Sequence, residues 1–247
     1  MKPIIEVKDL SFKYTANSPL ILNSISFKIE KGTITSIAGL SGCGKTTLAF
    51  CLCGAIPKSM PGIIDGSIII EGEDIKNLNL PNLAQKVGMV FQDVDNQLFL
   101  PTVEAEIAFA PENLCLPYEE IEKRVEKVID MLGIESLRYK NPSQLSGGQK
   151  HLVALASILS LDPEIIILDE VLSELDRKNK KLIISVIKSL NKAGKTIIII
   201  DHSIKNLMVA NSILLMKNGN IEDRIEVDDN NELLYNRLSG FFLQQEY

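Results

Sequence analysis

Apolar residues along this chain fall into short unbroken runs separated by polar turns. The runs at 165–168 and 195–200 are rich in isoleucine and have the length of a strand, which is typical of central parallel strands buried on both faces. Residues 33–38 and 87–91 predict two further strands. Stretches of helical composition separate these strands, so the chain is expected to be an α/β protein with a mostly parallel sheet.

Apolar and polar residues alternate instead in two N-terminal stretches, 4–14 and 20–30. Alternation predicts strands with one solvated face, so an antiparallel β-piece is expected before the strand at 33–38. A short strand bounded by glycines is expected at 66–72. The C-terminal region predicts a strand pair and an amphipathic helix near 232–242.

Downstream of residue 101 the pattern becomes helical. Thr102 is a suitable N-cap, and Glu104 and Glu106 follow in the first turn, where acidic side chains stabilise a helix. A second helix with apolar residues at helical spacing is expected from 117 onward. We therefore expect a single domain over 1–222 with a helical insert at about 102–142, a short helical tail over 223–247, and helices at 149–161 and 173–193.

The composition is ordinary for a globular protein: 247 residues, 45% hydrophobic and 23% charged. No apolar run reaches the roughly 18 residues needed to span a bilayer, so any membrane role is expected to come through partners. Residues 1–4 lead directly into a strand pattern, so no signal peptide is expected. A formal net charge of −6 argues against nonspecific nucleic-acid binding, which needs a basic surface.

The cysteines fit neither a metal site nor a redox motif. Cys51 and Cys53 are separated by one residue, which is not a zinc or redox spacing, and no histidine pair accompanies them. All four cysteines are expected to be reduced and structural, as in a cytosolic protein. They are Cys43, Cys51, Cys53 and Cys115.

The segment 39–46 reads G-L-S-G-C-G-K-T and matches G-x-x-x-x-G-K-[ST], the phosphate-binding loop. A buried strand precedes it and helical composition follows, which is the context that the motif requires. Lys45 would reach the β- and γ-phosphates, Thr46 would ligate Mg²⁺ and Thr47 would touch the α-phosphate. The alternative is an ordinary glycine turn. The remaining loop residues expected to cradle phosphate are Gly39, Ser41, Gly42, Cys43 and Gly44.

Polar residues follow three of the predicted strands. Asp169 and Glu170 end one of them, at the edge of an α/β sheet where ligands bind. Asp169 would hold Mg²⁺ through water, and Glu170 would polarise an attacking water as general base. His202 could contact the γ-phosphate, and Gln92 could sense Mg²⁺ or the water. Taken alone, these residues also have structural interpretations. Asp169 and Glu170 could be an acidic pair on the surface, and His202 could be a structural histidine.

The segment 145–149 reads L-S-G-G-Q and offers a second anion site. Its glycines leave backbone N–H groups open at a helix N-terminus, but no side chain there can do acid–base work. Two such sites in one chain would be redundant for one nucleotide. A two-fold dimer resolves this, because each nucleotide would lie between the loop of one subunit and this helix of the other. The residues concerned are Ser146, Gly147, Gly148 and Gln149.

Together these motifs resemble the ATP-binding cassette (ABC) ATPases over residues 7–218, in the order of that family. The resemblance implies an α/β P-loop NTPase fold, with a RecA-like parallel sheet core, an antiparallel β-subdomain and an inserted helical subdomain. It implies ATP and Mg²⁺ as cofactors, with Tyr14 stacking on the base and Asp176 coupling two sites across a dimer. Ser146 and Gly148 would contact the γ-phosphate in trans. The expected catalytic set is Lys45, Gln92, Glu170 and His202, and the expected metal set is Thr46, Gln92 and Asp169.

A narrower resemblance covers 87–117 and is to the ATPases of energy-coupling-factor (ECF) transporters, which import vitamins or cobalt and nickel ions. It implies a groove, lined by Leu98, Phe99 and Phe109, that receives a transmembrane subunit. The implied partners are a second ATPase subunit in a homodimer or heterodimer, a transmembrane coupling subunit and a substrate-binding membrane subunit, with no nucleic acid. The implied location is peripheral, on the cytoplasmic face of the cell membrane.

The chain departs from the family pattern at several positions. Hydrophobic or small residues replace proline, glycine, threonine or arginine there, and no catalytic group is lost. The alternatives are an ATPase of another ABC importer, a non-transport ABC protein acting on DNA or ribosomes, and an idle regulatory subunit. One cassette, the absence of a zinc spacing and the acidic charge favour transport. The departures are Val94, Ala110, Cys115, Leu152, Val171 and Leu172.

Overall fold

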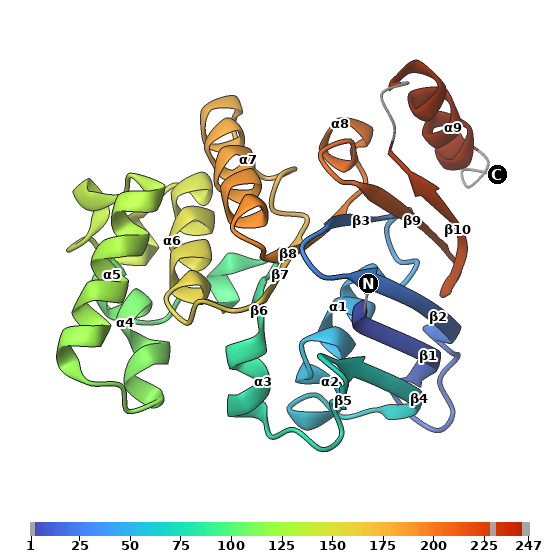
Figure 1. Ribbon diagram of the computed structural model, residues 1–247, viewed down its shortest axis with the longest axis horizontal. Coiled ribbons are helices and arrows are strands. Elements are labelled where there is room, and N and C mark those ends of the chain that lie inside the picture. Colours follow the sequence, from blue (N-terminus) through green and yellow to red (C-terminus); the bar gives the residue numbers. More distant parts are fainter. Residues whose placement is uncertain (1–2, 228–230, 244–247) are drawn as a thin grey trace.

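The computed structural model describes residues 3–227 and 231–243. Its strands form two sheets (Figure 1). The smaller sheet is antiparallel, in the order β2-β1-β4-β5: β1 (Pro3–Lys13), β2 (Leu22–Glu30), β4 (Ile63–Ile70) and β5 (Glu73–Asp74). The larger sheet has the order β10-β9-β3-β8-β7-β6: β3 (Ile34–Ala38), β6 (Val87–Val90), β7 (Ile165–Asp169), β8 (Thr196–Asp201), β9 (Ser212–Lys217) and β10 (Asn220–Glu226).

The larger sheet is parallel except at its β9–β10 edge. Helices α4 to α7 gather beside one face, and α1 and the smaller sheet lie on the other (Figure 1). Since the strands are parallel, their carboxyl ends meet at one edge of the sheet. The helices that matter for the site are α1 (Lys45–Leu52), α3 (Leu80–Lys86), α4 (Val103–Asn113), α5 (Tyr118–Leu132), α6 (Gly147–Leu159), α7 (Arg177–Lys192), α8 (Ile204–Leu207) and α9 (Asn231–Leu243).

Strand β7 shows why its sequence is an unbroken apolar run. Ile166 and Leu168 point to the helical face, whereas Ile165 and Ile167 point to the face covered by α1 and the smaller sheet. Successive side chains of a strand alternate between faces, and both faces here are dry. The apolar residues of β7 are therefore held from both sides, which fixes the end of the strand where its carboxylates lie.

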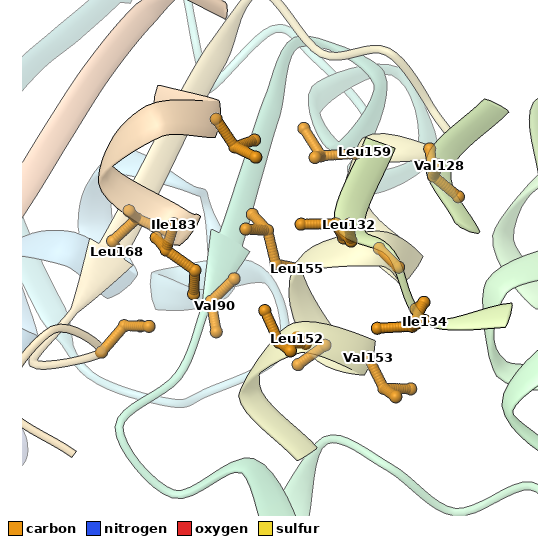
Figure 2. Close-up of a cluster of buried hydrophobic side chains, with 14 of the residues drawn as sticks. Val90, Val128, Leu132, Ile134, Leu152, Val153, Leu155, Leu159, Leu168 and Ile183 are labelled. Atoms are coloured by element: carbon orange, nitrogen blue, oxygen red, sulfur yellow. The ribbon is translucent and has the colours of Figure 1, made fainter. Parts of the chain in front are cut away.

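The helical face of the sheet has a close-packed hydrophobic core of its own. Leu152 and Leu155 of α6 lie between the strands, represented by Val90 and Leu168, and helix α5, represented by Leu132 (Figure 2). Helix α5 has its apolar residues on one stripe and ends at Gly133, whose left-handed φ of 61° terminates the helix. This packing joins the helical subdomain to the sheet.

Two helices begin elsewhere than the sequence predicted. Helix α6 begins at Gly147 rather than at residue 149, because Ser146 is its N-cap. Helix α7 begins at Arg177 rather than at residue 173, because the Asp176 carboxylate accepts hydrogen bonds from two backbone N–H groups of its first turn. Residues 171–176 therefore form a loop between β7 and α7. Helix α3 was not predicted.

The C-terminal helix α9 packs on α8 and on the β9–β10 pair, where Leu234 and Leu238 are buried. The expected boundary at residue 222 falls inside β10, which continues to Glu226. Within the described part of the chain, no helix combines the length and the apolar character needed to cross a membrane.

Candidate functional site

The phosphate-loop motif lies between β3 and α1, as its sequence requires. Gly44 is the N-cap of α1 and has a φ of 106°, a conformation that a residue with a Cβ rarely adopts. A Cβ on Gly39 would overlap the backbone oxygen of Met216 on β9. Cys43 is buried and its backbone oxygen accepts a hydrogen bond from Gly219 at 3.0 Å. The loop is therefore held tightly against the sheet.

Lys45 is buried, with 4% of its surface exposed, and its side chain turns back across the loop. Its Nζ donates to the backbone oxygens of Gly39 at 2.9 Å and Leu40 at 3.0 Å. The same Nζ lies 3.7 Å from Glu170 Oε1. A positive charge is thus fixed at the start of α1, where open N–H groups and the helix dipole also favour an anion.

Nine of the predicted site residues line one cavity of about 470 Å³, together with Ile21. At its outer end, Tyr14 is 43% exposed, and its hydroxyl lies 3.4 Å from Thr47 Oγ1. The Tyr14 and Phe12 rings are nearly perpendicular, with their centroids 5.0 Å apart, and Tyr14 lines the cavity. The nine are Tyr14, Ser41, Gly42, Gly44, Lys45, Thr46, Thr47, Gln92 and Glu170.

Glu170 is the point where three predicted catalytic side chains meet. Gln92 Nε2 donates to Glu170 Oε2 at 3.1 Å, and His202 Nδ1 lies 3.5 Å from the same oxygen. Lys45 approaches the other carboxylate oxygen. Glu170 has a left-handed φ of 53°, which is uncommon for a residue with a side chain and is often found at functional sites. The ends of β6, β7 and β8 therefore converge on one carboxylate.

Asp169 is fully buried, and neither of its carboxylate oxygens has a hydrogen-bond partner within the described residues. Burial is the main cause that raises its pKa to about 6, with the nearby Glu170 and Asp201 adding to it and the Thr46 hydroxyl opposing it. An orphaned buried carboxylate beside a hydroxyl fits a bound Mg²⁺, which takes one or two protein ligands and fills its remaining positions with water and phosphate.

We expect Asp169→Asn to stabilise the nucleotide-free protein at neutral pH. The raised pKa means that the native state prefers the protonated acid, so this contribution to stability is present below about pH 4 and is lost as pH rises through about 6. At neutral pH the buried charge costs roughly 3 kcal/mol by this argument. The measurement is the free energy of unfolding, by urea, of the native chain and the variant between acid and neutral pH.

Asp130→Asn, a change at an exposed aspartate on α5, is the matched control and should leave the profile unchanged. Mg²⁺ with ATP should stabilise the native chain more than it stabilises Asp169→Asn. If the free energies of unfolding of the native chain and Asp169→Asn differ by the same amount at every pH, the raised pKa of Asp169 is wrong. Only titration of Asp169 would make this difference depend on pH.

Sequence reasoning assigned no role to Asp201, which the structure shows fully buried at the end of β8. Its carboxylate accepts hydrogen bonds from Ser173 Oγ, the Ser203 N–H and Asn206 Nδ2, each at 2.8 Å. The signal was available, because Asp201 ends a buried strand in the same way as Asp169 does. Its partner Ser173 was not readable, since it lies 28 residues away on the loop that follows β7.

The second predicted anion site, at the start of α6, does not line this cavity, and α6 and α1 lie on opposite sides of the strands (Figure 1). Ser146 Oγ accepts from the Gln149 N–H at 3.4 Å, and Gln149 Oε1 accepts from the Ser146 N–H at 3.0 Å, which closes a capping box. Gly148 packs beside Asn179 of α7, so these glycines and Asp176 lie together at the starts of α6 and α7. Within one chain, the two predicted phosphate-binding helix starts therefore do not meet.

A groove of about 530 Å³ opens beside the start of α6, lined in part by Leu98 and Phe99. Phe109 does not line it but packs edge-on against Phe99 at 5.1 Å between ring centroids. The buried Glu106 carboxylate accepts from the backbone N–H groups of Phe99 and Leu100, and so holds the groove wall. Sequence reasoning had placed Glu106 only as a helix-starting acid.

Residues 22–173 match the family model for ABC transporters. The chain belongs to the ABC transporter family. This ABC chain is 42% identical over 221 residues to the energy-coupling factor transporter ATP-binding protein EcfA of Methanococcus maripaludis. The aligned region covers 88% of this chain and 77% of the relative. It is 39% identical over 222 residues to a putative ABC transporter ATP-binding protein of Methanosarcina acetivorans, covering 89% of this chain but 35% of that relative's length.

Among solved structures, cbiO1 from Clostridium perfringens, described as part of the ABC transporter complex cbiONQ, has a TM-score of 0.82 at 31% identity. The likeness covers 97% of this chain and 93% of cbiO1. The predicted α/β P-loop fold of an ABC cassette is confirmed, as is the resemblance to the ABC family. Four departures from the family pattern are core residues here: Val94, Leu152, Val171 and Leu172.

Proposed function

We propose that this chain is the ATP-binding and ATP-hydrolysing subunit of an ECF-type importer, powering uptake of a vitamin or a cobalt/nickel-type micronutrient through a transmembrane partner. The observation that carries the proposal is the 42% sequence identity between this chain and an EcfA protein, over 88% of the chain. The likeness to cbiO1 and the groove beside Phe99 support it. An ATPase of another ABC importer is the second candidate, since other relatives are ABC proteins of unnamed solute.

In the proposed site the triphosphate of ATP lies along the loop 39–46 and the start of α1. Lys45 is held at the right place by two backbone oxygens and would contact the terminal phosphates. Tyr14 would stack on the base at the outer end of the cavity. Thr46, Gln92 and Asp169 would hold Mg²⁺, which when bound stabilises negative charge on phosphate oxygens.

Hydrolysis needs a water aligned with the γ-phosphate, and Glu170 is proposed to accept a proton from it. Gln92 and His202 contact the Glu170 carboxylate and keep it directed at one point. His202, half exposed at the cavity edge, would also donate to the γ-phosphate. These roles follow from the contacts that converge on Glu170.

The site is proposed to be completed by a second ATPase subunit, identical or related. The starts of α6 and α7, with Ser146, Gly147, Gly148, Gln149 and Asp176, lie away from the cavity within one chain. In a two-fold dimer the α6 helix start of one subunit would face the phosphate loop of the other. ATP binding would then close the dimer, and hydrolysis would reopen it.

The groove beside α6 is proposed to receive the transmembrane coupling subunit, which works with a substrate-binding membrane subunit and places this chain on the cytoplasmic face of the membrane. Phe99 is 65% exposed at the groove. An exposed aromatic residue beside apolar neighbours is typical of an anchoring contact in a protein interface. Lys150 and Asp95 form an ion pair across the groove, which connects α6 with the segment after Gln92.

The test of this function is recovery of the membrane complex. We expect the tagged chain, purified from detergent-solubilised native membranes, to bring a hydrophobic coupling subunit and a small membrane-embedded binding subunit in fixed stoichiometry. Recovery of a substrate-binding partner of another importer class would favour the second candidate. Recovery with ribosomes or DNA alone would overturn both.

We expect Phe99→Ala to lower co-purification of the coupling subunit by about tenfold or more, because truncating a central aromatic anchor commonly costs 2 kcal/mol or more of binding. Tyr118→Ala is the matched control, since Tyr118 is an exposed aromatic residue of the same helical subdomain outside the groove. Equal recovery with both variants would show that the groove is not the docking site. Thermal unfolding of both variants checks that they remain folded.

A further inference from the structure

Asp201 lies at the carboxyl edge of the larger sheet but outside the proposed catalytic set. It is paired in register with Ala38, the residue directly before the phosphate loop, and it is fully buried. A buried carboxylate is costly unless it is hydrogen-bonded. Its partners are all supplied by the segments that follow β7 and β8: Ser173, Ser203 and Asn206.

These hydrogen bonds bracket His202. The Ser203 N–H donates to Asp201 Oδ1, so the backbone is fixed on both sides of the histidine. Asn206 of α8 donates to Asp201 Oδ2 and holds the next turn of the chain. Because the His202 side chain is half exposed, the position of the His202 backbone sets where the imidazole ring lies.

The same carboxylate reaches the loop that follows Glu170. Ser173 Oγ donates to Asp201 Oδ1, and the Ser173 N–H donates to the Glu170 backbone oxygen at 3.1 Å. The Glu170 N–H in turn donates to the backbone oxygen of Ile200 at 2.9 Å. A closed set of bonds therefore joins the turn that carries His202 to the turn that carries Glu170.

We propose that Asp201 is a positioning residue, which fixes His202 relative to Glu170 by joining Ser173 to the Ser203 turn and to Asn206. The proposal rests on the proposed role of His202 in ATP hydrolysis. Asp201 itself does not line the cavity proposed to hold ATP. Its effect is on the geometry that lets His202 Nδ1 stay beside Glu170 Oε2.

The first test removes the two hydrogen bonds of Ser173 Oγ, which donates to Asp201 and accepts from Asn206 Nδ2 at 3.2 Å. The buried Asp201 carboxylate keeps its hydrogen bonds from the Ser203 N–H and Asn206. Ser173→Ala is expected to lower kcat for ATP hydrolysis by about tenfold. A small displacement of His202 loses part of the rate acceleration that a correctly positioned acid or base supplies. The Kd for ATP, measured by fluorescence titration, should change less than about twofold. Ser36→Ala is the matched control. It removes a buried serine hydroxyl that donates to Leu207 of α8 without touching Asp201, and should keep the native kcat.

A double variant separates positioning from general structural support. In a His202→Ala background, Ser173→Ala should lower kcat by less than about twofold, because the group it positions is already gone. If His202→Ala alone keeps the native kcat, the proposed role of His202 fails, and the role of Asp201 fails with it. If His202→Ala lowers kcat and Ser173→Ala lowers it by the same factor in both backgrounds, the proposed function stands and the role of Asp201 is overturned.

The second test exchanges the two ends of one hydrogen bond. Asp201→Asn brings an amide against the amide of Asn206 and should lower kcat, whereas Asp201→Asn combined with Asn206→Asp restores a donor and an acceptor to this pair. We expect the combined variant to recover most of the lost kcat. A combined variant with native thermal stability and no recovery of kcat would overturn the positioning role.

Discussion

Replacing Glu170 by glutamine is expected to abolish ATP turnover while ATP binding is retained. Glutamine has the size of glutamate and can keep contact with Gln92 and His202, so the cavity should hold its shape. It cannot accept a proton from water, and loss of a positioned general base lowers kcat by about 10² to 10⁴. The measurements are phosphate release at saturating ATP and equilibrium binding of ATP.

The same variant should accumulate as an ATP-bound dimer, because closure would no longer be followed by hydrolysis. Size-exclusion chromatography with light scattering, with and without ATP and Mg²⁺, checks this. Glu164→Gln, a change just before the opposite end of β7, is the control and should keep near-native turnover. Turnover near the native value in Glu170→Gln would refute the general-base assignment.

Lys45→Ala is expected to weaken ATP binding itself, by about 30-fold or more, since truncating one partner of a buried, hydrogen-bonded charge pair costs about 2 to 5 kcal/mol. The buried Nζ also bridges Gly39 and Leu40, so its loss removes two bonds that hold the loop closed. Calorimetric titration with ATP and Mg²⁺ measures the effect. Unlike Glu170→Gln, this variant should not form the ATP-dependent dimer.

Lys58→Ala is the control for Lys45→Ala, because Lys58 is an exposed lysine at the end of helix α2 (Ala55–Lys58), outside the cavity that Lys45 lines. Thermal unfolding without nucleotide shows whether Lys45→Ala remains folded. If the folded Lys45→Ala chain binds ATP as tightly as the native chain, the phosphate-loop assignment is wrong. If it binds weakly but still hydrolyses ATP at the native kcat, Lys45 acts in binding alone.

Much of the site was predictable because it depends on short-range pattern. The glycines and Lys45 of the phosphate loop lie within eight residues, and a buried apolar strand leads into them. The apolar run at 165–168 required a strand buried on both faces. In a parallel sheet the residues after such strands meet at one edge, and this rule is enough to bring Gln92, Glu170 and His202 to the same side of the molecule.

Helix starts were less predictable, because a polar residue near a helix start can lie inside the first turn or cap the helix from just before it. The acidic and polar residues at 173–176 have helical composition, yet Asp176 uses its carboxylate to cap α7. Glu106 has the position of a helix-starting acid, yet it is buried and binds the backbone of Phe99 and Leu100. Such choices depend on which distant atoms lie within reach of the side chain.

The amino-acid sequence by itself determined the class of fold and the residues of the phosphate loop, since periodicity and local motif carry that information. Tertiary structure alone decided that Asp201 joins Ser173, 28 residues away, and that the α6 helix start lies away from the cavity beside the phosphate loop. It also decided that Asp169 is buried without a hydrogen bond from the described part of the chain. These features arise where loops from separate strands converge, and no local pattern specifies the distance between them.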